Sequence, residues 1–288
     1  MTPPVFILAP HRSFTSITCA MLGQHPELLG VPELNLCIAE RMRGWWLAYS
    51  AGRGIGASGL VRTVAQVYFG AQTEEAAELA RAWIGRRLDR STSSVFRELA
   101  AELQPRALVD KSPLNARPVG LARLDRAFPR ARYLHLVRDP VTRAQSVTAA
   151  LPQFDLPVNL VDPIEQWYSI HTGVLGFLEG LPRDRWMRLH GEHLMADPAS
   201  TLRQIAAWLG VGTDVETIDE MLHPERSPFA TFGPPSAPLG NDVEFLRRPE
   251  LRRDRGRRSE TGEADGWATG MAELPHNVRE LAVEFGYE

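Results

Sequence analysis

The chain has 288 residues, of which 44% are hydrophobic and 23% charged, and its formal net charge is −3 at pH 7. This length suits one large α/β domain with a full core, and so small a charge gives no electrostatic reason to expect nucleic acid or an anionic membrane as a partner. No apolar run approaches the roughly 18 residues that a membrane-spanning helix needs. The residues Met1-Thr2-Pro3-Pro4 lack the basic start of a signal peptide. We therefore expect a cytoplasmic protein that binds neither nucleic acid nor membrane.

The N-terminal segment combines a strand, a polar turn and a helix. Val5 to Leu8 is a short apolar run of strand formers, a polar turn follows at 10–13, and helical periodicity begins near Ile17. This order aims backbone N–H groups and the positive end of a helix at an anion. The turn adds a cation, Arg12, and three hydroxyls, those of Ser13, Thr15 and Ser16. The segment therefore predicts a phosphate- or sulfate-binding turn.

Two common nucleotide-binding turns are excluded by the same residues. The segment at 9–16 reads APHRSFTS and contains neither glycine nor lysine, so it is not the Gly-rich loop of nucleotide triphosphatases. It also lacks the three spaced glycines of a dinucleotide-binding fingerprint.

Further strands are expected after a helical region. Helices are predicted over residues 35–50, 60–69, 73–88 and 94–103, and none carries a chemical signature. An apolar strand at 107–110 then ends in Lys111, and another at 133–137 ends in Arg138. Repeated strand–turn–helix units predict a single α/β domain, residues 1–288, with a central parallel sheet of four or five strands flanked by helices. In such a sheet Arg12, Lys111 and Arg138 would gather at the carboxyl edge, where ligands bind.

The later chain is mainly helical. A long amphipathic helix is expected over residues 163–179, a further strand at 185–189, and a terminal helix at 274–285. Residues 224–266 lose periodicity and contain an arginine cluster, so they form either a partly disordered run or a lid. Cys19 and Cys37 lie in apolar surroundings and are expected to be reduced.

Lys111 is the only lysine in the chain, which otherwise uses arginine for positive charge. An ammonium at this turn suggests the need for a compact point charge. The alternative is an ordinary solvated lysine on the surface.

Three motifs together resemble the sulfotransferases that use 3′-phosphoadenosine 5′-phosphosulfate (PAPS). Residues 11–16, HRSFTS, are similar to the family's 5′-phosphosulfate loop, Pro-Arg-Ser-Gly-Thr-Thr/Ser. Residues 133–147, YLHLVRDPVTRAQSV, resemble the 3′-phosphate motif, with Arg138 and Ser146 at its spacing. The turn at 109–113, VDKSP, resembles that of the bacterial and tyrosylprotein-type branch, and residues 224–266 are similar to a Gly-Asn/Asp-rich loop of sulfotransferase domains in polyketide assembly lines.

The resemblance implies a sulfotransferase that moves a sulfuryl group from PAPS to a hydroxyl of a small-molecule or carrier-bound acceptor, in secondary metabolism and without a metal. It implies a donor site made of Arg12, Ser13, Phe14, Thr15, Ser16, Arg138 and Ser146. Arg12 and Lys111 would stabilise the transferring group. Glu33 stands where the Glu-using branch has its general base, and the alternatives are His11 as the base or a cap role for Glu33.

Two positions depart from the family pattern. Phe14 replaces the glycine of the loop, and Gly191 replaces a tyrosine that usually helps to hold the adenine. A phenylalanine either takes the glycine's backbone angles with its ring turned away or blocks the donor. The second possibility leaves open a sulfotransferase-fold protein that has lost the donor and serves another anion-binding or non-catalytic role. The sequence does not indicate an oligomeric state.

Overall fold

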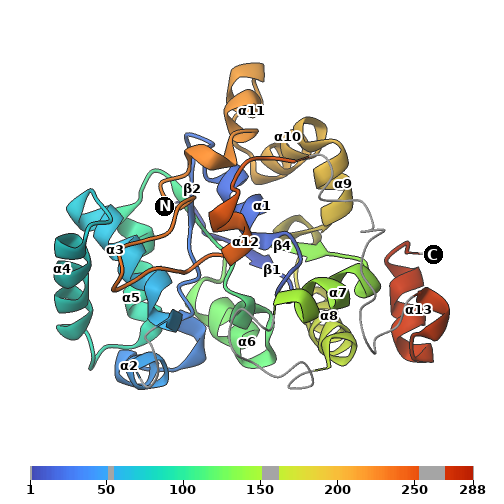
Figure 1. Cartoon of the computed structure of the whole chain (residues 1–288), viewed down its shortest axis with the longest axis horizontal. Coiled ribbons are helices and arrows are strands. Elements are labelled where there is room, and N and C mark those ends of the chain that lie inside the picture. The colour runs from blue at the N-terminus through green and yellow to red at the C-terminus, as the bar shows by residue number, and fades with distance from the viewer. Residues whose placement is uncertain (1, 51–54, 151–161, 253–269, 288) are drawn as a thin grey trace.

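The computed structural model describes residues 2–50, 55–150, 162–252 and 270–287. Its centre is a sheet of five parallel strands in the order β2-β3-β1-β4-β5 (Figure 1). The strands are β1 (Val5–Leu8), β2 (Leu28–Val31), β3 (Ala107–Asp110), β4 (Arg132–Val137) and β5 (Trp186–His190). The predicted α/β class with a central parallel sheet is confirmed.

Helices cover both faces of this sheet (Figure 1). The α-helices are α1 (Thr15–Leu22), α2 (Met42–Ser50), α3 (Ser58–Phe69), α4 (Glu74–Gly85), α5 (Thr92–Glu102), α6 (Pro118–Ala127), α7 (Pro140–Ala150), α8 (Pro163–Glu179), α9 (Gly191–Ala196), α10 (Pro198–Leu209), α11 (Val215–Met221), α12 (Val243–Arg247) and α13 (His276–Glu284). Helices α2 to α6 and α8 pack on one face, and α1 and α9 to α12 pack on the other. A smaller cluster joins α7, α8 and α13. None of the helices in the described ranges is long and apolar enough to cross a membrane.

The apolar run at β1 reflects burial on both sides. Phe6 and Leu8 point into one core cluster, while Val5 and Ile7 point into the other. Each of these four side chains is at most 2% exposed. Burying such a side chain contributes about 1.5–3 kcal/mol, so β1 is fixed at the centre of the sheet and the turn after it is held at the carboxyl edge.

Two local predictions are corrected by the structure. Strand β2 was not expected, and it contains Gly30, where a Cβ would lie 2.1 Å from the carbonyl oxygen of Cys19. The helix expected over 35–50 is broken into a short 3-10 turn at Leu36–Ile38 and α2. Ala39, which follows the 3-10 turn, has φ −135° and ψ 158°, extended angles that cannot continue a helix.

The segment at 228–242, after α11, lies along the carboxyl edge of the sheet, and a buried arginine holds it in place by hydrogen bonds. Arg62 of α3 donates to the carbonyl oxygens of Leu239 at 2.9 Å and Thr231 at 2.7 Å. The choice between a partly disordered run and a lid over 224–266 is not tested, because residues 253–266 lie outside the described residues. The expected single domain over residues 1–288 likewise remains a prediction.

Candidate anion-binding site

The turn between β1 and α1 has an unusual backbone. Arg12 and Phe14 have φ angles of 66° and 61°, in the left-handed region that residues with a Cβ seldom adopt. Ser13 between them is fully buried, and α1 begins at Thr15. Strain of this kind persists only where surrounding contacts hold it, and it is concentrated at binding sites. The turn therefore has the geometry of a binding element.

A buried arginine from α7 holds the start of this turn. Arg143 donates from Nε to the carbonyl oxygen of His11 at 2.9 Å, and its other nitrogens bond the Pro163 carbonyl and the Gln166 side chain. Burial lowers the pKa of Arg143 to about 9. The His11 side chain itself is exposed. Arg143 was assigned no role from the sequence; its only signal is its place in the helix that follows Arg138.

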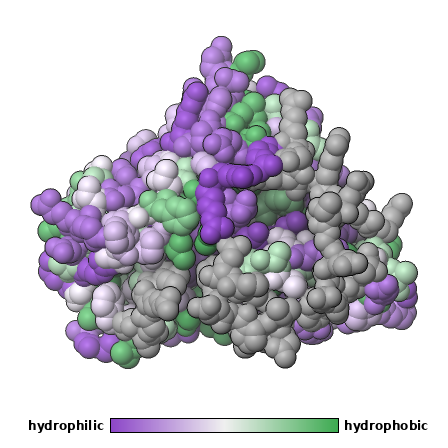
Figure 2. All heavy atoms as spheres, viewed as in Figure 1, coloured by the Kyte–Doolittle hydropathy of each residue, from purple (hydrophilic) through white to green (hydrophobic). Residues whose placement is uncertain are grey.

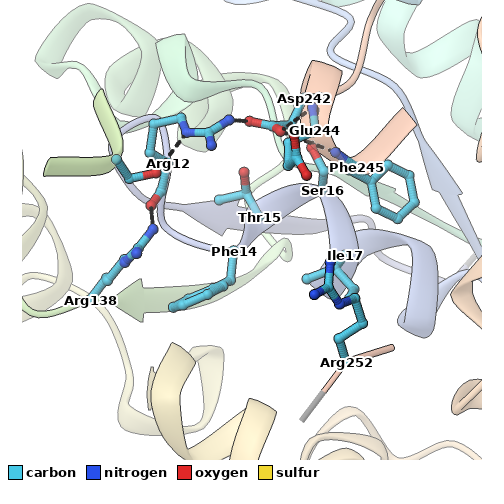
Figure 3. Close-up of a pocket in the computed structure, with 11 residues that line it drawn as sticks. Arg12, Phe14, Thr15, Ser16, Ile17, Arg138, Asp242, Glu244, Phe245 and Arg252 are labelled. Atoms are coloured by element: carbon cyan, nitrogen blue, oxygen red, sulfur yellow. Dashed lines mark hydrogen bonds and ion pairs between the residues drawn. The ribbon is translucent and has the colours of Figure 1, made fainter. Parts of the chain in front are cut away.

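Arg12 joins three segments that are distant in the sequence. Its Nε donates to the Ser146 hydroxyl of α7 at 3.0 Å, and its NH1 forms an ion pair with the carboxylate of Asp242 (Figure 3). The backbone N–H of Asp242 in turn donates to the Ser16 hydroxyl at 3.1 Å. The structure thus brings the predicted residues Arg12, Ser16 and Ser146 together.

Asp242 is a site residue that the sequence analysis missed. Its carboxylate caps α12 by accepting from the N–H groups of Glu244 and Phe245. Burial alone would raise the pKa of Asp242, but Arg12 and these hydrogen bonds outweigh it, and the pKa lies below its usual range. The available signal was the run Gly240-Asn241-Asp242 within the irregular segment. In Figure 2 strongly hydrophilic side chains gather at the centre of this face, over α12.

Arg138 lies beside the turn with an unsatisfied donor. Its NH1 donates to the carbonyl oxygen of Arg12 at 2.5 Å, and Trp167 donates to the carbonyl oxygen of Arg138 at 2.8 Å. Burial lowers the pKa of Arg138 to about 10, so the guanidinium is charged at neutral pH. Its Nε and the hydroxyl of Ser13 are buried without a hydrogen-bond partner in the described part of the chain. Orphan buried donors are rare in proteins, and two of them beside one turn indicate an anion site.

Phe14 has a left-handed backbone conformation, φ 61° and ψ 14°, which glycine adopts without strain. Its ring points away from Thr15 (Figure 3) and lies 4.4 Å from the guanidinium carbon of Arg138, measured to the ring centroid. The ring also contacts Gly191 at the start of α9, where a Cβ would lie 2.3 Å from Cδ2 of Phe14, and it packs against the core cluster on the α1 face of the sheet. The two departures from the family pattern, Phe14 and Gly191, are therefore in direct contact.

Lys111 and Glu33 form a pair beside the same segment. The Lys111 ammonium donates to the Glu33 carboxylate at 2.8 Å and to the Gly240 carbonyl at 3.4 Å. Lys111 has 0% side-chain exposure, so the alternative of a solvated surface lysine is wrong. The Glu33 N–H also donates to the Gly240 carbonyl at 2.8 Å. Gly240 thus links this pair to Asp242, which is bound to Arg12.

A cavity lies over the turn, and every predicted donor residue except Ser13 lines it. Glu33, Lys111 and His11 are not among its lining residues. Five of the lining residues were not predicted as site residues from the sequence: Ile17, Asp242, Glu244, Phe245 and Arg252. The lining residues are Arg12, Phe14, Thr15, Ser16, Ile17, Arg138, Ser146, Asp242, Glu244, Phe245 and Arg252. Groups of three or more His, Cys, Asp or Glu side chains arranged for a metal ion were not found in the described ranges.

Comparison with known proteins agrees with this geometry. The family model described as "Sulfotransferase family" matches residues 3–214. This range includes strands β1, β3 and β4 and the turns after them that carry Arg12, Lys111 and Arg138. The chain belongs to the sulfotransferase family.

Two solved structures resemble this sulfotransferase over nearly its whole length. The "Sulfotransferase Domain from the Curacin Biosynthetic Pathway" has 24% identity and a TM-score of 0.80, covering 100% of this chain and 99% of that one. The "Sulfotransferase Domain from the Synechococcus PCC 7002 Olefin Synthase" has 25% identity and a TM-score of 0.79, covering 99% and 95%. A search of curated proteins found no match.

Proposed function

We propose that this sulfotransferase uses PAPS as its donor and sulfates a hydroxyl of a small-molecule or carrier-bound acceptor. The observation that carries the proposal is the buried guanidinium of Arg138, which lines the cavity over the Arg12 turn and whose Nε has no hydrogen-bond partner among the described residues. Leaving a buried donor unsatisfied costs about 1–3 kcal/mol. An anionic group bound at the turn would remove that cost.

The residues fit the two charged ends of the donor. Arg12, the hydroxyls of Thr15 and Ser16 and the N–H groups at the start of α1 would hold the 5′-phosphosulfate. Arg138 and Ser146 would hold the 3′-phosphate. PAPS supplies the sulfuryl group, with the 5′-phosphate as its leaving group. We propose no metal in this reaction, because the arginines and Lys111 can neutralise the developing charge.

Glu33 is the proposed general base. It is 24% exposed, so a hydroxyl could reach its carboxylate, while the buried Lys111 holds that carboxylate in place and supplies a fixed positive charge near the transferring group. His11 at the start of the turn is the rival base. Desolvation by the surrounding chain lowers the pKa of its imidazole, so the ring would be neutral at pH 7 and able to accept a proton.

The acceptor class is supported by the likeness to a sulfotransferase domain of an olefin synthase and by the motifs of the polyketide-associated branch. We propose an acceptor from secondary metabolism and a cytoplasmic location.

The donor is tested by titrating 3′-phosphoadenosine 5′-phosphate (PAP) and AMP, which differ only in the 3′-phosphate. Arg138→Ala should weaken PAP binding by about 1.5–3 kcal/mol, as expected for a charged hydrogen bond, and should hardly change AMP binding. Arg130→Ala, an exposed arginine just before β4, is the matched control. Equal losses for both nucleotides would contradict the assignment. A native chain that binds neither would favour the alternative of a sulfotransferase fold in another anion-binding or non-catalytic role.

The base is tested by transfer of labelled sulfate to a candidate acceptor. Glu33→Gln should keep PAP affinity and lower kcat by about 10²–10⁴-fold, the usual weight of one acid–base group. If His11→Ala abolishes turnover while Glu33→Gln retains more than about a tenth of it, the base is His11.

A further inference from the structure

The position of Phe14 calls for a physical explanation. Its φ of 61° is unstrained for glycine and costs roughly 1–2 kcal/mol for a residue with a Cβ. A large side chain is kept at this position only if its contacts offset that strain. The ring packs against the core cluster on the α1 face of the sheet, and it contacts Arg138 and Gly191.

The contact with Arg138 is a cation–π interaction. The guanidinium carbon lies 4.4 Å from the ring centroid, well within the roughly 6 Å over which such pairs attract. In the part of the chain that the structure describes, no carboxylate forms an ion pair with Arg138, and its side chain makes one hydrogen bond, to the Arg12 carbonyl. Glu192 and Asp139 lie near enough to favour the charged form of Arg138, and the Phe14 ring is a direct contact of its guanidinium.

The contact with Gly191 explains why that residue is glycine. Gly191 does not have a positive φ, so its backbone does not require glycine. Space does, because a Cβ would lie 2.3 Å from Cδ2 and 3.0 Å from Cε2 of Phe14. The absence of a side chain at Gly191 leaves the space that the ring occupies.

We propose that Phe14 is a positioning residue for donor selectivity, and that Gly191 is the pocket in which it sits. The ring, held between Gly191 and Arg138, fixes the guanidinium so that its unpartnered Nε faces the 3′-phosphate of the donor. This inference rests on the proposed use of PAPS. Phe14 and Gly191 then act as one unit, a large residue in the turn matched by the smallest one at the start of α9.

The test is the ratio of PAP to AMP affinity in variants of the full chain. Phe14→Leu keeps an apolar side chain but removes the π face, and should lower PAP affinity by about 5- to 30-fold, the weight of one cation–π contact, with AMP affinity unchanged. Phe14→Tyr keeps the ring and should keep the native ratio. Phe69→Leu, an exposed phenylalanine at the end of α3, is the matched control and should also keep it.

Gly191→Ala tests whether Gly191 provides the space for the Phe14 ring. Its methyl group would displace the ring, so it should cause the same loss of PAP affinity as Phe14→Gly. The double variant Phe14→Gly/Gly191→Ala should lose no more than Phe14→Gly alone, because the ring that the methyl would displace is gone.

The outcomes separate the inference from the proposed function. If the native chain prefers PAP and Phe14→Leu keeps that preference, the role of Phe14 is overturned while the donor stands. Equal losses of PAP and AMP affinity in Phe14→Leu would also overturn it, because a ring that only fills space would affect both ligands. If the native chain shows no preference for PAP, both the donor and the selectivity role fail.

Discussion

The protein should lose different amounts of stability when Glu33 and Lys111, which form an ion pair, are replaced one at a time. Lys111 has 0% side-chain exposure and Glu33 has 24%. Removing the carboxylate leaves a buried ammonium whose remaining hydrogen bond is the 3.4 Å contact with the Gly240 carbonyl. Removing the ammonium leaves a carboxylate that water can reach. The free energy of unfolding should therefore fall more in Glu33→Gln than in Lys111→Met.

The size of the effect follows from this burial. Leaving a buried charge without its partner costs about 3–5 kcal/mol. Glutamine keeps one oxygen acceptor and the site is partly wet, so we expect about 1.5–3 kcal/mol for Glu33→Gln. At about 2–4 °C per kcal/mol for a large domain, the Tm should fall by roughly 3–12 °C. Lys111→Met replaces the buried charge with an apolar chain of similar volume and should cost less than about 1.5 kcal/mol.

Urea denaturation of the free protein measures both changes, and thermal melts give an independent order. The double variant Glu33→Gln/Lys111→Met is the control and should be more stable than Glu33→Gln, because it no longer contains the stranded cation. If Lys111→Met is the less stable single variant, or if Glu33→Gln has the same Tm as the native protein, the ion pair with Glu33 is not what stabilises the buried Lys111 side chain. The same melts show whether the activity of Glu33→Gln is measured on folded protein.

Three further predictions concern other buried groups. Burial raises the pKa of the Cys19 thiol to about 12 and that of Cys37 as well, so neither should react with Ellman's reagent at pH 8 until the protein is denatured. Folding lowers the pKa of Asp242. Its contribution to the free energy of unfolding is therefore fully present above the pKa of Asp in the unfolded chain, about 3.9. The stability difference between native protein and Asp242→Asn should thus be constant above about pH 5 and shrink as pH falls below about 4, in urea titrations at stepped pH. Arg62→Met should speed amide hydrogen exchange at residues 228–240, since Arg62 holds the Thr231 and Leu239 carbonyls; unchanged exchange would mean that other contacts fasten the segment.

The sequence predicted four strands of the sheet and missed β2 at one edge. Strands β1, β3 and β4 are mostly apolar runs, each followed by a polar turn with a cation, and that pattern also located Arg12, Lys111 and Arg138. Strand β2, LLGV, contains a glycine, and that glycine is there because Cys19 lies against it. A tertiary contact of this kind leaves no local pattern. The interruption of the 35–50 helix at Ala39 likewise depends on a tertiary contact, because the Thr92 hydroxyl donates to the Ala39 carbonyl at 2.7 Å.

The site was predicted where it follows strand ends and missed where distant segments meet. The ion pair between Arg12 and Asp242 joins residues near opposite ends of the chain, and periodicity says nothing about such a pair. The contact between Phe14 and Gly191 was hidden for the same reason. Each residue was recognised as a departure from the family pattern, but only the fold shows that they touch.

The position of β1 has a consequence for biosynthesis. The first strand of the chain is the middle strand of the sheet, and its neighbours are residues 107–110 and 132–137. During translation Val5–Leu8 therefore leaves the ribosome long before either neighbour exists, as an apolar segment with no strand to pair with. Sheets built from such distant pairings fold slowly and expose aggregation-prone segments meanwhile. A nascent chain halted before β4 is complete cannot form the Arg12 turn, so ribosome-bound chains of increasing length should acquire protease resistance only once β4 has emerged.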